Sequence, residues 1–226
     1  MIGDFKNIRR DPTLLVLLFV PFILFMLLRI VIPLLTSYYP DLSLYYPVVI
    51  ALFGLLNASF PGFIVSFILL DEKDLHLLPV IKVTPVSLSG FLLVRLIYMS
   101  VIGFLTGFMI IRYNGFYHLS ALESIELSIL CMLNAPILLL SMATLAKNKV
   151  EGLTYMKAAN ILLILPVAVL FITTPYENML ALFPAFWVYK FFDVLHHREL
   201  VFVLGTLCLS GYNILVYRYA CLQGTD

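Results

Sequence analysis

The sequence has few charged residues and almost no cysteine. Only 12% of its 226 residues are Asp, Glu, Lys or Arg, about half the share found in ordinary soluble domains. Hydrophobic residues make up 62%, and the mean hydropathy is +1.05. This composition indicates an integral membrane protein. The net charge of +1 comes from basic residues spread along the chain, which gives no patch for nucleic acid.

The cysteines and histidines indicate neither a disulfide framework nor a metal site. The three cysteines lie within or at the end of apolar runs, at positions 131, 208 and 221, and we expect them to be packing residues. His196 and His197 form the one cluster that suggests a metal. Adjacent residues on a helix point in different directions, so these two do not face a common ion well. We interpret them as part of a surface turn.

Motifs of several catalytic classes are also missing. The sequence contains no GxxxxGK[ST] phosphate loop, no HExxH and no GxSxG. The chain is therefore not expected to be an enzyme, and any ATP hydrolysis requires another subunit. An ion-driven transporter is expected to carry acidic residues deep in its spans. Here every Asp and Glu lies in a predicted loop or near the end of a span.

Long apolar runs are abundant, and a membrane span needs about 20 such residues. The run after residue 13 is too long for a secretory signal and lacks a cleavage site. The segment 178–192 is apolar but only half a span long, with Pro184 in its middle, so we predict that it dips into the outer leaflet and returns. A full seventh span is the alternative. Six stretches are long and apolar enough to be spans, or nearly so: 14–36, 45–70, 90–112, 122–146, 157–173 and 199–219.

The basic residues predict the orientation of these spans. With the N-terminus inside, nine of the fourteen Lys and Arg residues fall in inner segments and three in outer ones. Cytoplasmic loops carry an excess of Lys and Arg. Both termini are therefore predicted to lie in the cytoplasm.

Polar residues inside the predicted spans are candidates for a transport pathway. Arg29 lies in the outer half of the first span. It either pairs with a carboxylate, for which Asp41, Glu123 and Glu126 are candidates, or faces a cavity and binds an anionic group of a substrate. Arg95 lies near the start of the third span and is expected to snorkel to the inner surface. Amides in four spans either line a pathway or bond between helices, the commoner role: Asn57, Asn134, Asn160 and Asn213.

The longest polar interruption is residues 71–95, DEKDLHLLPVIKVTPVSLSGFLLVR. Four charges open it, a short amphipathic segment follows, and Thr84-Pro85 ends that segment. The pattern alone leaves two interpretations open, a helix that rests on lipid headgroups and a helix that docks on a partner outside the membrane. Residues 1–13 are basic and amphipathic, and they are expected to lie along the inner surface.

Taken in chain order, these features resemble the permease subunits of the type-2 ABC exporter family. The sharpest match is residues 71–96, with acidic residues, a short apolar helix and the triplet VTP before the third span. The resemblance implies an all-α membrane fold of the type V exporter kind. Its parts are an N-terminal elbow helix, six spans, a cytoplasmic coupling helix between spans two and three, and a re-entrant outer hairpin before span six.

The resemblance also implies partners and a cargo. Two separate ABC ATPase subunits would bind ATP and Mg²⁺, and a second permease, identical or related, would complete the pathway in a prokaryotic plasma membrane. The sequence lacks the long outer domain of larger family members, as do the compact drug, peptide and natural-product exporters. The expected substrate is an amphiphilic small molecule, peptide or lipid-like compound.

Three groups of residues receive roles from the resemblance. The ATPase-docking surface comprises Glu72, Lys73, Asp74, Leu75, Leu77, Leu78, Ile81, Lys82, Val83, Thr84 and Pro85. The elbow helix includes Phe5, Lys6, Arg9 and Arg10, and the outer gate includes Phe183, Pro184, Phe186 and Trp187.

Two other functions are weighed against export. A membrane-embedded enzyme would need His76, His118 and His196 to converge, yet they are predicted on opposite sides of the bilayer. A non-transporting immunity or assembly factor with a permease-like fold is the second alternative, and the sequence leaves it open.

Overall fold

The structure, a computed structural model, describes residues 9–75, 88–171, 175–193 and 198–223. Within these ranges every regular element is a helix. Six helical stretches are long and apolar enough to cross a membrane, which confirms the expected all-helical membrane fold. They are α2 (Pro12–Tyr38), α3 (Tyr46–Asp74), α5 (Leu88–Tyr113), α6 (Ala121–Leu145), α7 (Lys149–Ile164) continued by η2 (Leu165–Leu170), and α9 (Arg198–Gln223).

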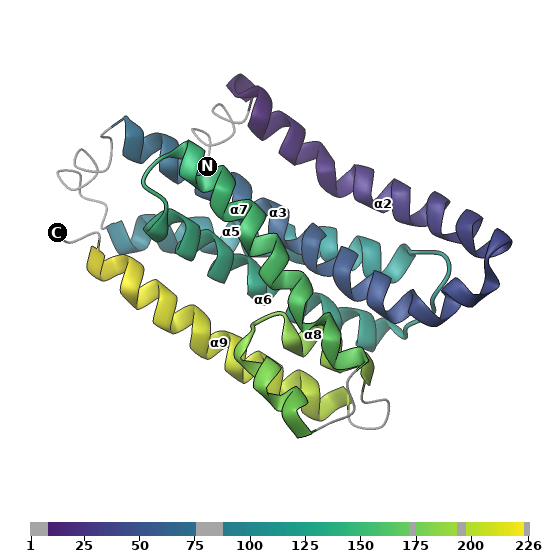
Figure 1. Cartoon of the computed structure of the whole chain (residues 1–226). Coiled ribbons are helices and arrows are strands. Elements are labelled where there is room, and N and C mark those ends of the chain that lie inside the picture. The colour runs from purple at the N-terminus through teal and green to yellow at the C-terminus, as the bar shows by residue number, and fades with distance from the viewer. Residues whose placement is uncertain (1–8, 76–87, 172–174, 194–197, 224–226) are drawn as a thin grey trace.

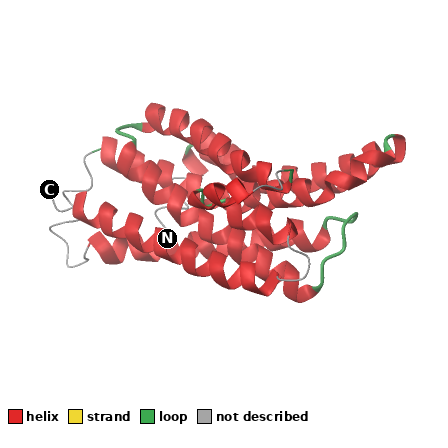
Figure 2. Ribbon diagram, turned by 60° about the horizontal axis from the view of Figure 1, so that its bottom comes forward, coloured by secondary structure: helices red, strands yellow, loops and turns green. Residues whose placement is uncertain are grey.

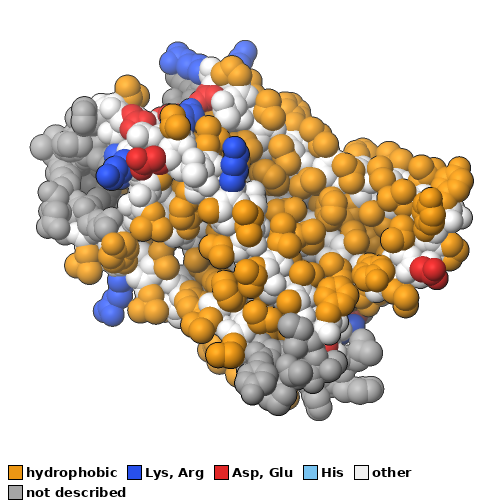
Figure 3. All heavy atoms as spheres, viewed as in Figure 1, with side chains coloured by type: hydrophobic (Ala, Val, Ile, Leu, Met, Phe, Trp, Pro, Cys, Tyr) orange, Lys and Arg blue, Asp and Glu red, His pale blue; other side chains and the backbone are white. Residues whose placement is uncertain are grey.

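Successive spanning helices run in opposite directions, so the bundle has two distinct ends (Figure 1). The terminal end holds the start of α2, the end of α3, the start of α5, the α6–α7 connection and the end of α9. The distal end holds η1 (Pro40–Tyr45) and the α5–α6 connection, and η3 (Pro175–Leu182) and α8 (Phe186–Asp193) lie toward it. Most charged side chains in Figure 3 gather at the terminal end, and the rest of the visible surface is largely apolar, as expected where a bundle faces lipid.

The centre of the bundle is α3, which packs against both α5 and α6. Small residues recur every four positions on the two helices that meet there, Gly54, Ala58 and Gly62 on α3, and Gly103 and Gly107 on α5. A Cβ atom at Gly103 would lie only 2.7 Å from the carbonyl oxygen of Ala58. The absent side chains let the two backbones approach closely, as in other small-residue contacts between membrane helices.

A polar contact accompanies this close approach of α3 and α5. Pro61 has no amide hydrogen, so the carbonyl of Asn57, four residues earlier, loses its helical partner. The Thr106 hydroxyl lies 3.4 Å from that carbonyl, and Asn57 Nδ2 donates to the Thr106 carbonyl at 2.7 Å. The neighbouring helix therefore brings a hydroxyl near the backbone group that the proline leaves open, although this hydroxyl lies closer to the Ile102 carbonyl of its own helix, at 3.0 Å.

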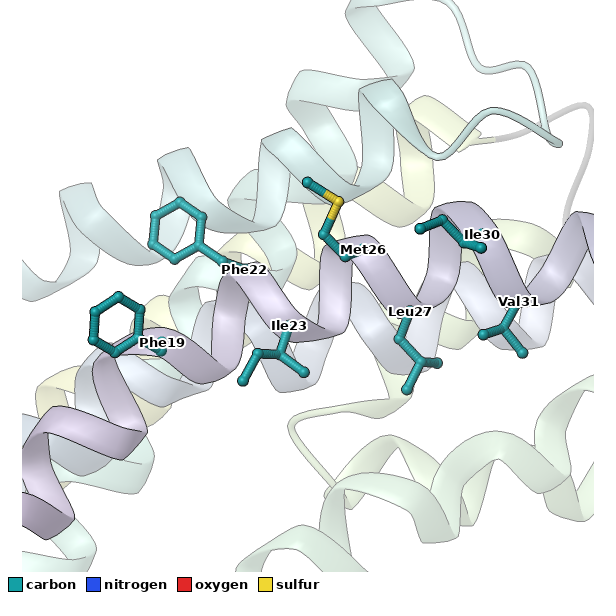
Figure 4. A pocket seen from close by; sticks show the side chains of 7 residues that line it. All are labelled: Phe19, Phe22, Ile23, Met26, Leu27, Ile30 and Val31. Atoms are coloured by element: carbon teal, nitrogen blue, oxygen red, sulfur yellow. The ribbon is translucent and has the colours of Figure 1, made fainter.

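At the edge of the bundle lies α2, which packs along α3 and touches α5. Its sequence contains neither glycine nor alanine. The α2–α3 connection extends beyond the other helices at the distal end (Figure 2). Side chains on the outer face of α2 form a shallow hollow of about 450 Å³, lined by Phe19, Phe22, Ile23, Met26, Leu27, Ile30 and Val31 (Figure 4).

The fifth spanning helix begins earlier than composition predicts. It starts at Lys149, whereas the apolar run was predicted to start at residue 157. Asn148 caps the helix by accepting a hydrogen bond from the Glu151 amide at 2.9 Å. The first two turns carry charged residues. Hydropathy therefore predicts a loop there, although the backbone is helical.

The segment 178–192 forms the end of η3 and most of α8. With only eight residues, α8 is too short to cross a membrane. Its aromatic residues Phe186, Tyr189, Phe191 and Phe192 are buried in the bundle, and the Tyr189 hydroxyl donates to the Leu163 carbonyl at 3.1 Å. The segment is therefore anchored to α7 and does not form a seventh spanning helix.

Candidate functional site: the charged terminal end

Charged side chains from three parts of the chain meet at the terminal end. The last turns of α3 contribute Asp71, Glu72 and Asp74, α5 contributes Arg95, and the start of α7 contributes Lys149. Residues 76–87, which join α3 to α5, lie outside the described residues. The described site is therefore the pair of helix ends from which this connection leaves, together with the groups that hold them.

Arg95 and Glu72 form a buried, bidentate ion pair. Arg95 Nη1 donates to Glu72 Oε2 and Nη2 to Oε1, both at 2.6 Å. The two side chains are only 4% and 13% exposed, and the guanidinium lies 4.2 Å from the ring centre of Phe91. The expectation that Arg95 snorkels is wrong, because the planar guanidinium finds a matching carboxylate inside the bundle. The pair joins α3 and α5 on either side of residues 76–87.

Lys149 connects three segments. Its ammonium group donates to Asp11 Oδ2 and, at 3.0 Å, to Asp71 Oδ2. Asp11 also caps α2 by accepting a hydrogen bond from the Thr13 amide at 2.8 Å. Burial raises the pKa of the Asp11 carboxyl, but hydrogen bonds from Lys149 and Thr13 outweigh burial and leave the pKa below its ordinary value. Lys149 thus holds the starts of α2 and α7 against the end of α3.

The turn before α7 also contacts the end of α3. Lys73 Nζ donates to the Ala146 carbonyl at 3.2 Å, and the Lys149 amide lies 3.4 Å from Asp74 Oδ2. Sequence reasoning assigned this turn to an inner loop and did not single out Lys149. The available signal was Asn148 with a glutamate three residues later, a spacing that marks the start of a helix.

The predicted docking and elbow residues are only partly within the described ranges. Glu72 and Lys73 are half-buried in the last turns of α3, whereas Asp74 and Leu75 are exposed. The other docking residues lie outside the described residues: Leu77, Leu78, Ile81, Lys82, Val83, Thr84 and Pro85. Of the elbow residues, Arg9 and Arg10 are exposed, and Phe5 and Lys6 lie outside the described residues.

The four predicted pathway amides differ in their surroundings. Asn57 and Asn134 are buried inside the bundle, where Asn134 Nδ2 bonds to the Leu130 carbonyl of its own helix. Asn160 and Asn213 are half-buried. None of the four side-chain oxygens has a hydrogen-bond partner in the part of the chain that the structure describes. Asn57, Asn134 and Asn213 thus use their N–H groups and leave their acceptors open.

Arg29 contacts a backbone group and none of the expected carboxylates. Its Nη1 donates to the Tyr113 carbonyl at 2.5 Å, at the end of α5. Glu123, one of the expected partners, pairs with Arg198. Gly115, whose φ of 88° places it in the left-handed region, lies beside the Arg29 guanidinium. Arg29 therefore ties α2 to the distal turn that follows α5.

A lateral groove of about 360 Å³ lies between α5 and α9, with α6 as its floor. Toward the terminal end, the Tyr217 hydroxyl donates to the Ser89 carbonyl at 3.2 Å and joins the two walls. Asn213 Nδ2 donates to the Leu133 and Leu209 carbonyls, both at 2.9 Å, which fixes α9 against the floor. The lining residues are Leu93, Leu96, Leu133, Pro136, Leu140, Ser210, Asn213, Ile214 and Tyr217.

The predicted outer-gate residues lie at the start of α8 and just before it. Phe186 is buried, and Phe183, Pro184 and Trp187 are half-buried. Trp187 packs on Gly205 of α9, where a Cβ atom would lie 3.0 Å from Trp187 Cβ. In the described ranges, no three His, Cys, Asp or Glu side chains gather as metal ligands would.

Comparison with known proteins identifies a family. The family model described as fluoroquinolones export permease protein Rv2686c-like matches residues 4–220. The fluoroquinolones export permease proteins Rv2686c and MT2760, from Mycobacterium tuberculosis strains H37Rv and CDC 1551, are each 28% identical over 200 residues, which cover 85% of this chain and 79% of the relative. No solved structure matches the chain. Because the family model spans nearly the whole sequence, the chain belongs to the Rv2686c-like fluoroquinolone export permease family.

Proposed function

We propose that this chain is the membrane subunit of an ATP-driven ABC exporter that moves an amphiphilic compound out of the cytoplasm. The family membership and the six candidate spans support export through the membrane. The sequence contains no GxxxxGK[ST] phosphate loop, which supports a separate ATPase subunit that binds ATP and Mg²⁺. Two ATPase copies and a second permease, identical or related, complete the proposed transporter.

The observation that carries the proposal is the ion pair between Arg95 and Glu72, at the base of the α3–α5 connection. Arg95 and Glu72 join the two helix ends from which residues 76–87 leave. A partner that pushes on this connection therefore moves α3 and α5 together, and these are the helices at the centre of the bundle. Lys149 extends the same displacement to α2 and α7. ATP-driven closure of the ATPases would thus shift the bundle between inward-open and outward-open states of similar free energy.

The proposed docking surface is a coupling helix within residues 72–85, supported on the cytoplasmic side by the N-terminal elbow helix. Both termini are then cytoplasmic, and the terminal end faces the ATPases. At the distal end, η3 and α8 would form the re-entrant outer hairpin that closes the exit. Phe186 is buried, and its ring packs edge to face against the Trp187 ring. This packing suits a gate that opens only when α8 shifts.

Co-purification tests the proposal. The permease is expressed with the ATPase encoded nearest to it, and Leu77, Leu78 and Ile81 are each replaced with Asp. We expect these changes to remove the ATPase from the purified complex and to abolish drug-dependent ATP hydrolysis in vesicles. The matched control is Leu44→Asp, at the distal end, where the leucine is 77% exposed. If no ATPase co-purifies with the unmodified chain, the export proposal fails.

A further inference from the structure

We propose that the lateral groove between α5 and α9 binds the exported compound inside the membrane. This inference rests on the proposed export function and names where the substrate is held. The ligand class is an aromatic or aliphatic amphiphile that carries a hydrogen-bond donor. The groove has a floor on α6, walls on α5 and α9, and one end closed by the bond from Tyr217 to Ser89.

The size of the groove fits a small molecule. Its volume of about 360 Å³ lies within the range of about 300 to 1,000 Å³ common for small-molecule sites. Leucine and proline side chains make most of the lining, with Leu96 on one wall, Ile214 on the other and Pro136 on the floor. An apolar body therefore packs along the groove without displacing any charged group.

Two polar groups point to an occupant other than a lipid tail. Ser210 and Asn213 lie one turn apart on the same wall. The Ser210 hydroxyl makes no hydrogen bond within the described residues, and Asn213 Oδ1 has no partner there either. Both amide hydrogens of Asn213 are held by backbone carbonyls, so its oxygen remains oriented as an acceptor. An acceptor and a hydroxyl without partners favour a ligand that supplies a donor.

The depth of these groups distinguishes the ligand from a phospholipid. Ser210 is twelve residues after Arg198 and thirteen before Gln223, which places it about 18 to 20 Å from either end of α9. That is the middle of the hydrocarbon core, where phospholipids offer only methylene groups. A compound whose polar group reaches this depth fits the groove better than a bilayer lipid does.

A binding experiment tests the inference with norfloxacin, a fluorescent fluoroquinolone that carries an N–H donor, as the probe. The purified chain is placed in phosphatidylcholine nanodiscs and titrated with norfloxacin. Ile214→Trp fills the groove and is expected to weaken binding at least about tenfold. Ser210→Ala removes one hydrogen bond and is expected to weaken it about threefold. The matched control Leu215→Trp, at an exposed neighbour that does not line the groove, should bind like the unmodified chain.

Cysteine protection locates the probe directly. Ser210→Cys is introduced after the accessible Cys208 and Cys221 are replaced with Ser. Cys131 is kept, because it is buried and unreactive in the folded chain. In detergent micelles without added phospholipid, where water reaches the groove and the thiol can ionise, we expect norfloxacin to slow maleimide labelling at position 210 at least about fivefold and to leave labelling of a Leu215→Cys control unchanged. Protection by phospholipid alone would make the groove a lipid site, and disulfide-linked dimers through position 210 would make it a subunit contact. Either result overturns the inference.

The inference and the proposed function fail in different ways. If Ile214→Trp still binds norfloxacin and exports it with the ATPase present, the groove is not the binding site and the export function stands. If the chain binds norfloxacin in the groove but no ATPase associates with it, the export proposal fails and the binding site stands.

Discussion

Helices α2 and α3 are neighbours of similar length, yet one lies at the edge of the bundle and the other at its centre. In the most apolar stretch of α2 the mean hydropathy is 3.0 and 17% of the residues are buried, whereas in that of Pro40–Asp74, which contains α3, the values are 2.1 and 67%. The difference follows the small residues, because α3 carries Gly54, Ala58 and Gly62 and α2 carries no glycine or alanine. Apolarity places a helix in the membrane, and on α3 the small residues allow the close approach of α5 that holds it at the centre.

The largest expected effect is at the buried ion pair that joins α3 to α5. Arg95→Met leaves the Glu72 carboxylate buried without its partner, and we expect a loss of about 3 to 5 kcal/mol in the free energy of unfolding. Thermal unfolding in detergent measures it. The double variant Glu72→Gln with Arg95→Met should recover most of the loss, since no charge is then left alone. A single variant as stable as the unmodified chain would show that α3 does not depend on this pair.

A smaller effect is expected where the backbones of α3 and α5 approach. Gly103→Ala places a methyl group against the Ala58 carbonyl, which cannot move away as a flexible side chain would, and should cost about 1 to 3 kcal/mol. Gly107→Ala is the matched control one turn along α5, where the nearest atom, Ala58 Cβ, lies at an ordinary 3.4 Å. Helix propensity favours alanine at both positions. Equal unfolding temperatures for the two variants would contradict the close packing at Gly103.

The smallest effect is expected at the attachment of α2. The Lys149 side chain is 27% exposed, so solvent screens its pair with Asp11, and Lys149→Met should cost less than about 1 kcal/mol. The folded pKa of Asp11 is below its ordinary value of 3.8, so this contribution is complete above that value and is lost as the pH falls through the folded pKa. Across this pH range, the free energy of unfolding should depend less on pH in Asp11→Asn than in the unmodified chain. Identical pH profiles for the two chains would show that Asp11 does not contribute to the attachment of α2.

Hydropathy predicted the number and order of the spanning helices but not their neighbours. A span is a property of about twenty consecutive residues, so it can be read locally. The bond from Lys149 to Asp11 joins residues 138 positions apart, and the bond from Arg29 to the Tyr113 carbonyl joins residues 84 apart. No local pattern indicates such pairs, which is why Arg95 was expected to snorkel and Arg29 was expected to meet either a carboxylate or an anionic group of a substrate.

The resemblance to a permease family is confirmed at the level of export permeases. The assignment of residues 72–85 to a coupling helix remains a prediction, because residues 76–85 lie outside the described ranges. What the structure adds is the base of that connection, with Glu72 paired to Arg95. The pair was predictable only in part, because Glu72 belonged to the recognised acidic run while its partner, 23 residues further on, was expected to reach the inner surface.

The bond between Asn57 and Thr106 has a consequence for how the chain is made. The two residues are 49 positions apart, which corresponds to roughly 2 to 10 s of synthesis at about 5 to 20 residues per second. During that interval α3 has left the ribosome with an amide and a proline-freed carbonyl whose contacts in the finished bundle lie on α5. A chaperone or the insertion machinery would need to shelter this helix until its partner arrives, so the centre of the finished bundle is also its most vulnerable part during biogenesis.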